Sequence, residues 1–176
     1  RKKAFPYFLE SVFSLSLFAI ACYLMLYHMN AISVRNAYLA STVNLGSFLF
    51  HYVDAALVVV LLIISYKNLK LRSEFQSYLD SVILWYISII VIFIASAELD
   101  HIVVLSSYYP GFPIEPILNQ NHKIGFPILW GICSFILMFL GMRFKRKDCR
   151  IISLTLFLII LLKLFIFDIR GISEGG

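Results

Sequence analysis

A carboxylate and an imidazole stand close together in this chain where a long apolar stretch ends. Glu98 and His101 are three residues apart, so on a helix they share one face, while Asp100 points elsewhere. Such a pair can exchange protons with a substrate or supply two ligands to a metal ion. Two ligands do not complete a metal site, and solvated charges also belong at a helix end. We therefore treat Glu98 and His101 as candidate catalytic residues, predict no metal, and keep a structural role open.

The same spacing occurs inside another apolar stretch, where His51 is followed by Asp54. A charged side chain inside a bilayer is costly on most scales, so Asp54 needs a reason to be there. The two side chains could orient a proton or a metal ion, or form a polar contact with another helix. Asp54 is the third catalytic candidate, and His51 is a candidate for ligand binding.

Basic side chains that could bind an anion accompany the last two apolar stretches. His122 and Lys123 lie in a polar segment that opens one of them, and the N-terminus of a helix favours phosphate or carboxylate groups. Lys163 lies about 18 Å into the last stretch. It either extends to the membrane surface or pairs with Asp54 or Asp168. The predicted ligand-binding residues here are His122, Lys123, Lys163 and Asp168.

Five long apolar stretches must position these residues. Hydrophobic residues make up 61% of the 176 residues and charged residues 14%, a balance that a soluble domain of this size could not bury. Each stretch has roughly the 17–25 residues that a helix needs to cross a hydrocarbon layer of about 30 Å, and a helix satisfies its own backbone there. The sequence predicts an all-α, polytopic transmembrane bundle whose five helices span about residues 8–27, 46–66, 81–97, 125–144 and 151–167.

The distribution of positive charge predicts how this bundle is oriented. Most of the 15 Lys and Arg residues precede the first stretch or lie around every second gap, which is one side if every stretch crosses. The positive-inside rule makes that side cytoplasmic, so we predict a cytoplasmic N-terminus and an extracytoplasmic C-terminus. The residues are Arg1, Lys2, Lys3, Lys67, Lys70, Arg72, Arg143, Lys145, Arg146, Lys147 and Arg150.

The candidate residues gather toward the opposite, outer side of the predicted bundle. This one-sidedness predicts a polar pocket open to the extracytoplasmic face and argues against a continuous ion path across the membrane. The outer connections are 27–45, which can hold a short interfacial helix, and 98–124. The second contains Pro110, Pro113 and Pro116, so we expect it to be irregular and rich in turns.

Several function classes are disfavoured by the composition. The formal net charge of +5 is explained by membrane topology, so no nucleic-acid partner is predicted. The three cysteines form neither a disulfide framework nor a metal motif. Of the four histidines only His51 is well placed for haem, and no Gly-rich phosphate loop occurs, so no cofactor is predicted. The expected partners are the lipid bilayer and further transmembrane helices, from the same chain or from other membrane proteins.

Residues 122–171 resemble a known family. They read His-Lys-Ile-Gly-Phe-Pro-Ile-Leu-Trp-Gly, then Leu-Gly-Met-Arg-Phe-Lys-Arg-Lys at the end of a helix, and later Leu-Lys-Leu-Phe-Ile-Phe-Asp-Ile. This is similar to the C-terminal part of the bacterial predicted membrane proteins of domain-of-unknown-function family 2339, mainly through Trp130-Gly131 and the Lys163–Asp168 pairing. The resemblance implies a multi-pass protein of the bacterial cytoplasmic (inner) membrane, and it assigns no activity. We treat residues 1–176 as a single transmembrane helical domain, expected to be a segment of a longer membrane protein.

Three functions remain open on this sequence. The first is a non-enzymatic binding or scaffolding module of the cell envelope, favoured because no complete catalytic constellation is evident. The second is an envelope enzyme that acts on a lipid-linked or polysaccharide substrate at the outer leaflet, with Glu98, His101 or Asp54 as acid–base groups. The third is a transporter component, which would need polar residues through the full thickness of the membrane.

Overall fold

The computed structural model describes the backbone of residues 4–70 and 76–173, and within them the side chains of 15, 17–53, 55–60, 63 and 80–166. The described residues form helices joined by short turns, with no strand among them, so they are all-α as predicted. The chain divides into two compact units, Arg1–Glu74 and Phe75–Gly176, and each is described by itself.

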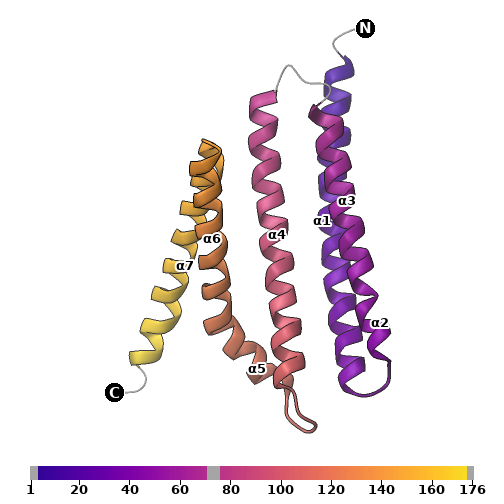
Figure 1. The fold of residues 1–176 in the computed structure, drawn as a ribbon, viewed down its shortest axis with the longest axis vertical. Helices are drawn as coiled ribbons and strands as arrows, with labels where there is room; N and C mark the ends of the chain where they lie inside the picture. The colour runs from indigo at the N-terminus through magenta and orange to yellow at the C-terminus, as the bar shows by residue number, and fades with distance from the viewer. Residues whose placement is uncertain (1–3, 71–75, 174–176) are drawn as a thin grey trace. The chain divides into compact units, whose positions relative to one another are not determined.

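The first unit contains α1 (Ala4–Leu39), α2 (Leu45–Leu49) and α3 (His51–Lys70) (Figure 1). The prediction that the first helix ends near Tyr27 was wrong, because α1 continues to Leu39. Hydropathy falls after residue 27, but no Gly or Pro interrupts the chain before Leu39, so the helix continues through polar residues. It ends in a turn at Ser41, which has a left-handed φ of 58°.

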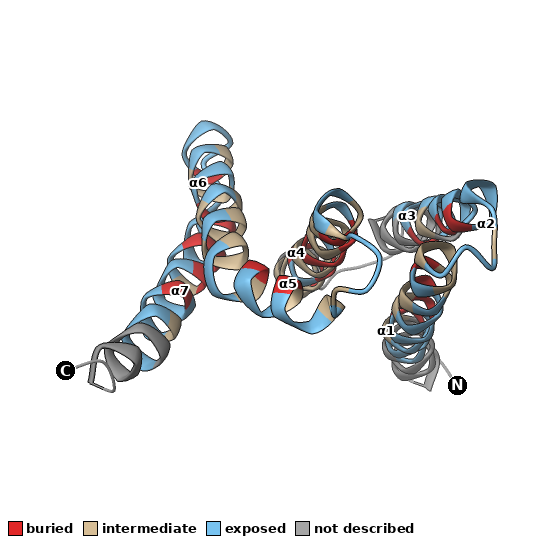
Figure 2. Cartoon of the chain, turned by 90° about the horizontal axis from the view of Figure 1, so that it is seen from below, coloured by how far each residue is buried: buried red, intermediate tan, exposed pale blue. Residues whose placement is uncertain are grey.

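One stripe of α1 carries the core of this unit. Leu24, Tyr27 and Ala31 are buried at helical spacing, and α1 contacts both α2 and α3. Figure 2 shows buried residues on each of these three helices. Phe48 of α2 and Val58 of α3 are also buried. The remaining faces of these helices carry large exposed apolar side chains.

The second unit contains α4 (Gln76–Ser107), α5 (Ile114–Gln120), the π-helix η1 (Asn121–Gly125), α6 (Phe126–Arg143) and α7 (Lys147–Ser173) (Figure 1). The expected irregular connection 98–124 is mostly helical, since only residues 108–113 lie outside helices. This prediction was wrong because none of the prolines interrupts a helix. Pro110 and Pro113 lie in the turn between α4 and α5, and Pro116 lies in the first turn of α5, where proline is tolerated. Gly111, at φ +91°, allows the chain to reverse there.

The helices α6 and α7 form a closely packed antiparallel hairpin (Figure 1). Gly141 permits the close approach, because a Cβ there would lie 3.0 Å from the backbone nitrogen of Arg150. Nearer the middle, Ser134 and Ser153 are both buried and exchange hydrogen bonds with each other's carbonyl oxygen, at 3.0 and 2.7 Å. Small and hydroxylated residues at such contacts are typical of helices that associate inside a membrane.

Four of the described helical segments are long and apolar enough to cross a membrane: Leu17–Leu39, Asp80–Ser107, Ile114–Arg143 and Lys147–Ile166. The predicted span 46–66 corresponds to α2 and α3, whose described apolar part, Leu45–Val60, is shorter than these. Large apolar side chains point outward along the helices, with Phe135 73% exposed. Lipid is the environment that stabilises such surfaces.

Candidate functional site

Asp100 lies at the centre of a polar network that joins α4 to η1. One carboxylate oxygen, Oδ1, accepts a hydrogen bond of 2.7 Å from the amide nitrogen of Asn121. The other, Oδ2, lies 2.9 Å from Nε2 of His122. Asn121 is buried, while the side chain of Asp100 is 15% exposed and that of His122 is 44% exposed. The network therefore fixes a carboxylate on one helix and presents an imidazole at the surface of the next.

The π-helix places Asn121 and His122 opposite Asp100. In η1 the backbone N–H of Phe126 donates to the carbonyl oxygen of Asn121, five residues back instead of four. Gly125 leaves room for the Asn121 side chain in this turn, because a Cβ there would lie 2.0 Å from Oδ1 of Asn121. A larger residue would push the Asn121 amide away from Asp100.

Pro127 explains why a lysine is needed nearby. With the Phe126 N–H bonded to Asn121, the next carbonyl, that of His122, would receive the N–H of residue 127 in the same pattern, and proline has none. A carbonyl group that is shielded from water and left without a donor is costly. Lys163 of α7 supplies the donor, since its Nζ hydrogen-bonds to the His122 carbonyl oxygen.

Two aromatic rings hold the Lys163 ammonium in place. Nζ lies 5.4 Å from the ring centroid of Phe126 and 5.1 Å from that of Trp130, within the range of cation–π attraction. The indole N–H of Trp130 in turn donates to Oγ of Ser96 on α4, at 2.9 Å. Three helices, α4, α6 and α7, therefore meet around one lysine.

The predicted catalytic residues of α4 lie beside this network. Glu98 is partly exposed and His101 is only 2% exposed. Asp100 was not a catalytic candidate, because it points away from that pair on a helix, but it is the residue that forms the hydrogen bonds to η1. Ser96, Asp100 and Val103 follow one another at helical spacing on the face of α4 that contacts η1 and α6. The signal that could have found this site is Asp100 together with the polar segment that ends in His122.

The remaining predicted site residues fall into two groups. Lys123 is exposed in η1, next to His122. Asp54 lies in α3 and Asp168 in α7, and their side chains are outside the described part of the structure. Among the described residues, no group of three His, Cys, Asp or Glu side chains could hold a metal ion.

His51 belongs to the first unit and is buried among aromatic rings. Its ring centroid lies 4.5 Å from that of Phe48 and 4.0 Å from that of Tyr52, and its Nδ1 hydrogen-bonds to the Phe48 carbonyl oxygen at the junction of α2 and α3. Sequence reasoning missed Arg35, which is 2% exposed in the same unit. Its Nε and Nη2 both donate to Oδ1 of Asn36, at 3.2 and 3.0 Å. The available signal was a single arginine in residues 27–45, which contain no other Asp, Glu, Lys or Arg.

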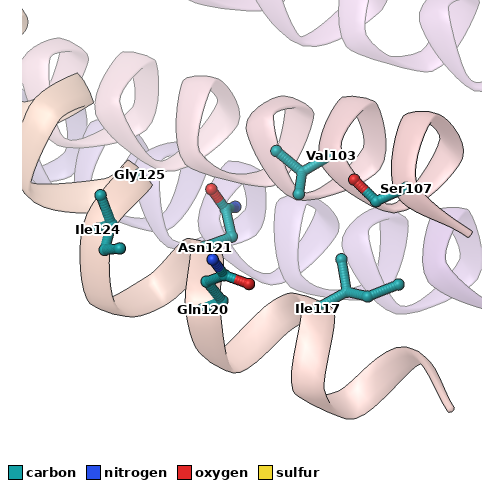
Figure 3. A pocket seen from close by; sticks show the side chains of 7 residues that line it. All are labelled: Val103, Ser107, Ile117, Gln120, Asn121, Ile124 and Gly125. Carbon is teal, nitrogen blue, oxygen red and sulfur yellow. The ribbon is translucent and has the colours of Figure 1, made fainter.

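A shallow hollow of about 310 Å³ lies beside the network, between α4 and the α5–η1 segment (Figure 3). Three apolar side chains, those of Val103, Ile117 and Ile124, alternate in its lining with the polar side chains of Ser107, Gln120 and Asn121. The lining residues are Val103, Ser107, Ile117, Gln120, Asn121, Ile124 and Gly125.

Comparison with known proteins identifies one relationship. Residues 1–174 match the family model described as predicted membrane protein (DUF2339), so the similarity extends from the C-terminal residues that resemble the family to nearly the whole chain. No curated protein and no solved structure matches the chain. The match covers both structural units, and the long apolar helices agree with its description. The chain therefore belongs to the DUF2339 family of predicted membrane proteins.

Proposed function

We propose that this multi-pass membrane protein crosses a bacterial inner membrane five times and is a non-enzymatic binding or scaffolding module, whose polar binding surface is at the extracytoplasmic end of its second unit. The cytoplasmic N-terminus and extracytoplasmic C-terminus follow from the positive-inside rule applied to the basic residues. The fifth span in this topology is the α2–α3 segment. We also propose that residues 1–176 form a single transmembrane helical domain.

The observation that carries the proposal is the convergence of polar side chains at one end of the second unit. Arg143 and Lys147 flank the basic turn between α6 and α7, whereas Lys123 lies twenty residues before Arg143. At 1.5 Å per residue this is about 30 Å, the thickness of a hydrocarbon layer. If the basic turn is cytoplasmic, the Asp100 network is at the outer interface, where it can meet a ligand or a partner.

The hydrogen bonding of the network favours binding over catalysis. Both carboxylate oxygens of Asp100 already accept hydrogen bonds, and the Lys163 ammonium already donates one to the His122 carbonyl oxygen. Side chains that are engaged in such hydrogen bonds hold the helices in fixed positions relative to one another and form a rigid surface. The exposed imidazole of His122 and the exposed Lys123 are the polar groups that this surface offers.

The proposal is tested by placing a photo-reactive amino acid at Gln120, which lines the hollow, in living cells. We expect a discrete adduct that decreases several-fold when Asp100→Asn is introduced. The same amino acid at Ile136, an exposed position on α6, serves as the control for general contact with lipid. Equal adducts at the two positions, or an adduct indifferent to Asp100→Asn, would show that this end of the unit is not a binding surface.

The orientation is tested separately by cysteine accessibility. The exposed residues Ser106 and Lys145 lie near opposite ends of the second unit, and each is replaced by cysteine in a background whose three native cysteines are alanine. An impermeant thiol reagent added to intact spheroplasts is expected to label the cysteine at 106 and not the one at 145. The reverse pattern would invert the proposed topology.

A second candidate function is an envelope enzyme acting at the outer leaflet, with Glu98, His101 and Asp54 as acid–base candidates. The specific observation in its favour is the Asp100–His122 pair, because a carboxylate that orients an imidazole is a recurring arrangement for a general base. His122→Gln distinguishes the two functions. An enzyme would lose its cellular function while the purified variant stays folded, whereas a binding module would retain a reduced Gln120 adduct.

A further inference from the structure

The free nitrogen of the His122 ring defines what the outer end of η1 can recognise. A neutral imidazole has one donor and one acceptor nitrogen. Because a carboxylate accepts hydrogen bonds, Nε2 carries the hydrogen toward Asp100, and Nδ1 is left as the acceptor. Within residues 80–166, whose side chains are described, the bond from Nε2 is the only hydrogen bond of this ring. A ligand at this position must therefore offer an N–H or O–H donor.

Lys123 adds a requirement for negative charge. It follows His122 directly in η1 and is exposed. Both oxygens of the Asp100 carboxylate already accept hydrogen bonds, from Asn121 and His122. The Lys123 ammonium is thus available to an anion within one helical turn of the His122 acceptor.

The depth of these two residues indicates where such an anion comes from. They lie about 30 Å along the helix from Arg143, so if the basic turn is at one interface they reach the phosphate level of the other leaflet. Lipid phosphate groups are the anions present at this level of a bilayer.

We propose that this site binds a phospholipid of the outer leaflet whose anionic headgroup carries a hydroxyl group, as phosphatidylglycerol does. Its phosphate pairs with Lys123, and its hydroxyl donates to Nδ1 of His122. The proposal rests on the binding function and the orientation proposed above, and it names the ligand of that site. Zwitterionic lipids fit less well because their positive group would lie near the Lys123 ammonium.

The test uses the full chain purified in detergent and native mass spectrometry with three added lipids. Dioleoylphosphatidylglycerol has both features, dioleoylphosphatidylmethanol keeps the charge without the hydroxyl, and dioleoylphosphatidylcholine has neither. A net hydrogen bond contributes about 1 kcal/mol, which is about five-fold in affinity, and a lysine near the interface contributes a similar amount. We therefore expect about five-fold preference for the glycerol over the methanol headgroup, and a further preference of that size over phosphatidylcholine.

Two variants assign these preferences to residues. His122→Phe is expected to remove the preference for the hydroxyl and retain that for the charge, whereas Lys123→Gln is expected to do the opposite. Lys147→Gln, an exposed lysine at the other end of the unit, is the matched control and should change neither. The proposal is overturned if the unaltered chain does not distinguish the glycerol from the methanol headgroup. It is also overturned if His122→Phe still does.

The outcome separates this proposal from the binding function itself. The lipid comparison uses the unaltered chain, so it does not depend on whether a variant folds. An Asp100-dependent adduct to another protein at Gln120, together with no discrimination among the lipids, would sustain the binding module and remove the lipid as its ligand. Equal adducts at Gln120 and Ile136 would remove both.

Discussion

Replacing Lys163 by methionine tests whether this lysine exists to satisfy the carbonyl group that Pro127 leaves without a donor. Methionine keeps the length and the apolar stem of the side chain while it removes the ammonium. A hydrogen bond to a charged group contributes about 1.5–3 kcal/mol in soluble proteins, but polar contacts between membrane helices average about 0.6 and reach about 1.7 kcal/mol. Cation–π attraction to Phe126 and Trp130 adds roughly 0.5–1 kcal/mol each. We expect Lys163→Met to lower the free energy of unfolding by about 2 kcal/mol.

The Pro127→Ala background isolates the hydrogen bond from the other contributions of Lys163. Alanine restores the N–H that the His122 carbonyl group lacks, so the loss of the lysine should then cost about 1 kcal/mol less. The assay is reversible unfolding of the full chain by dodecyl sulfate in mixed micelles, followed by circular dichroism, for all four combinations. Lys147→Met is the control for removal of a positive charge from α7.

The reasoning is refuted if the two substitutions are additive. Independent substitutions usually add within about 0.3–0.5 kcal/mol. A cost of Lys163→Met that is the same with proline and with alanine at 127, to within that range, would mean that the lysine acts only through its charge and the aromatic rings.

Three further substitutions probe the close contacts of the second unit by the same unfolding assay. Gly125→Ala should displace the Asn121 amide and lower the free energy of unfolding by about 1–3 kcal/mol, whereas Gly131→Ala, with open space at its Cβ position, should not destabilise the fold. Gly141→Ala should separate α6 from α7 at a similar cost, seen also as faster proteolysis in their connecting turn, and an unchanged stability would contradict the packing described. Ser134→Ala should cost only about 0.6 kcal/mol, and a loss above 2 kcal/mol would mean that its hydrogen bonds do more than join two helices.

The helical class and the membrane setting could be predicted from sequence because both depend on composition averaged over about twenty residues. The positions of the helix ends could not be predicted in this way. Polar residues such as Asn30 and Asn36 signal the membrane boundary, but a helix continues into the interface when no glycine or proline stops it, as α1 does. Hydropathy therefore predicted that a long apolar helix lies here and placed its end twelve residues too early.

The candidate site was predicted in part for a related reason. Glu98 and His101 were paired because their spacing is visible within one helix, whereas Asp100 binds residues more than twenty positions later in the chain. Recognising that contact from the sequence would have required the π turn, which changes the direction of every side chain that precedes it. His122, Lys123 and Lys163 could be named because each is a polar residue in an apolar setting, which needs no knowledge of the register.

The π turn of η1 also has a consequence for how the length of this segment can vary. A π turn is equivalent to one residue inserted into an α-helix, so deletion of one residue from it, such as the exposed Ile124, leaves an uninterrupted α-helix. The deletion rotates all preceding residues by about 100° around the helix axis relative to α6. Asn121 and His122 would then leave the face that meets Asp100, although the composition and hydropathy of the segment would barely change. A chain shorter by one residue here would still cross the membrane, and it would lose the polar network.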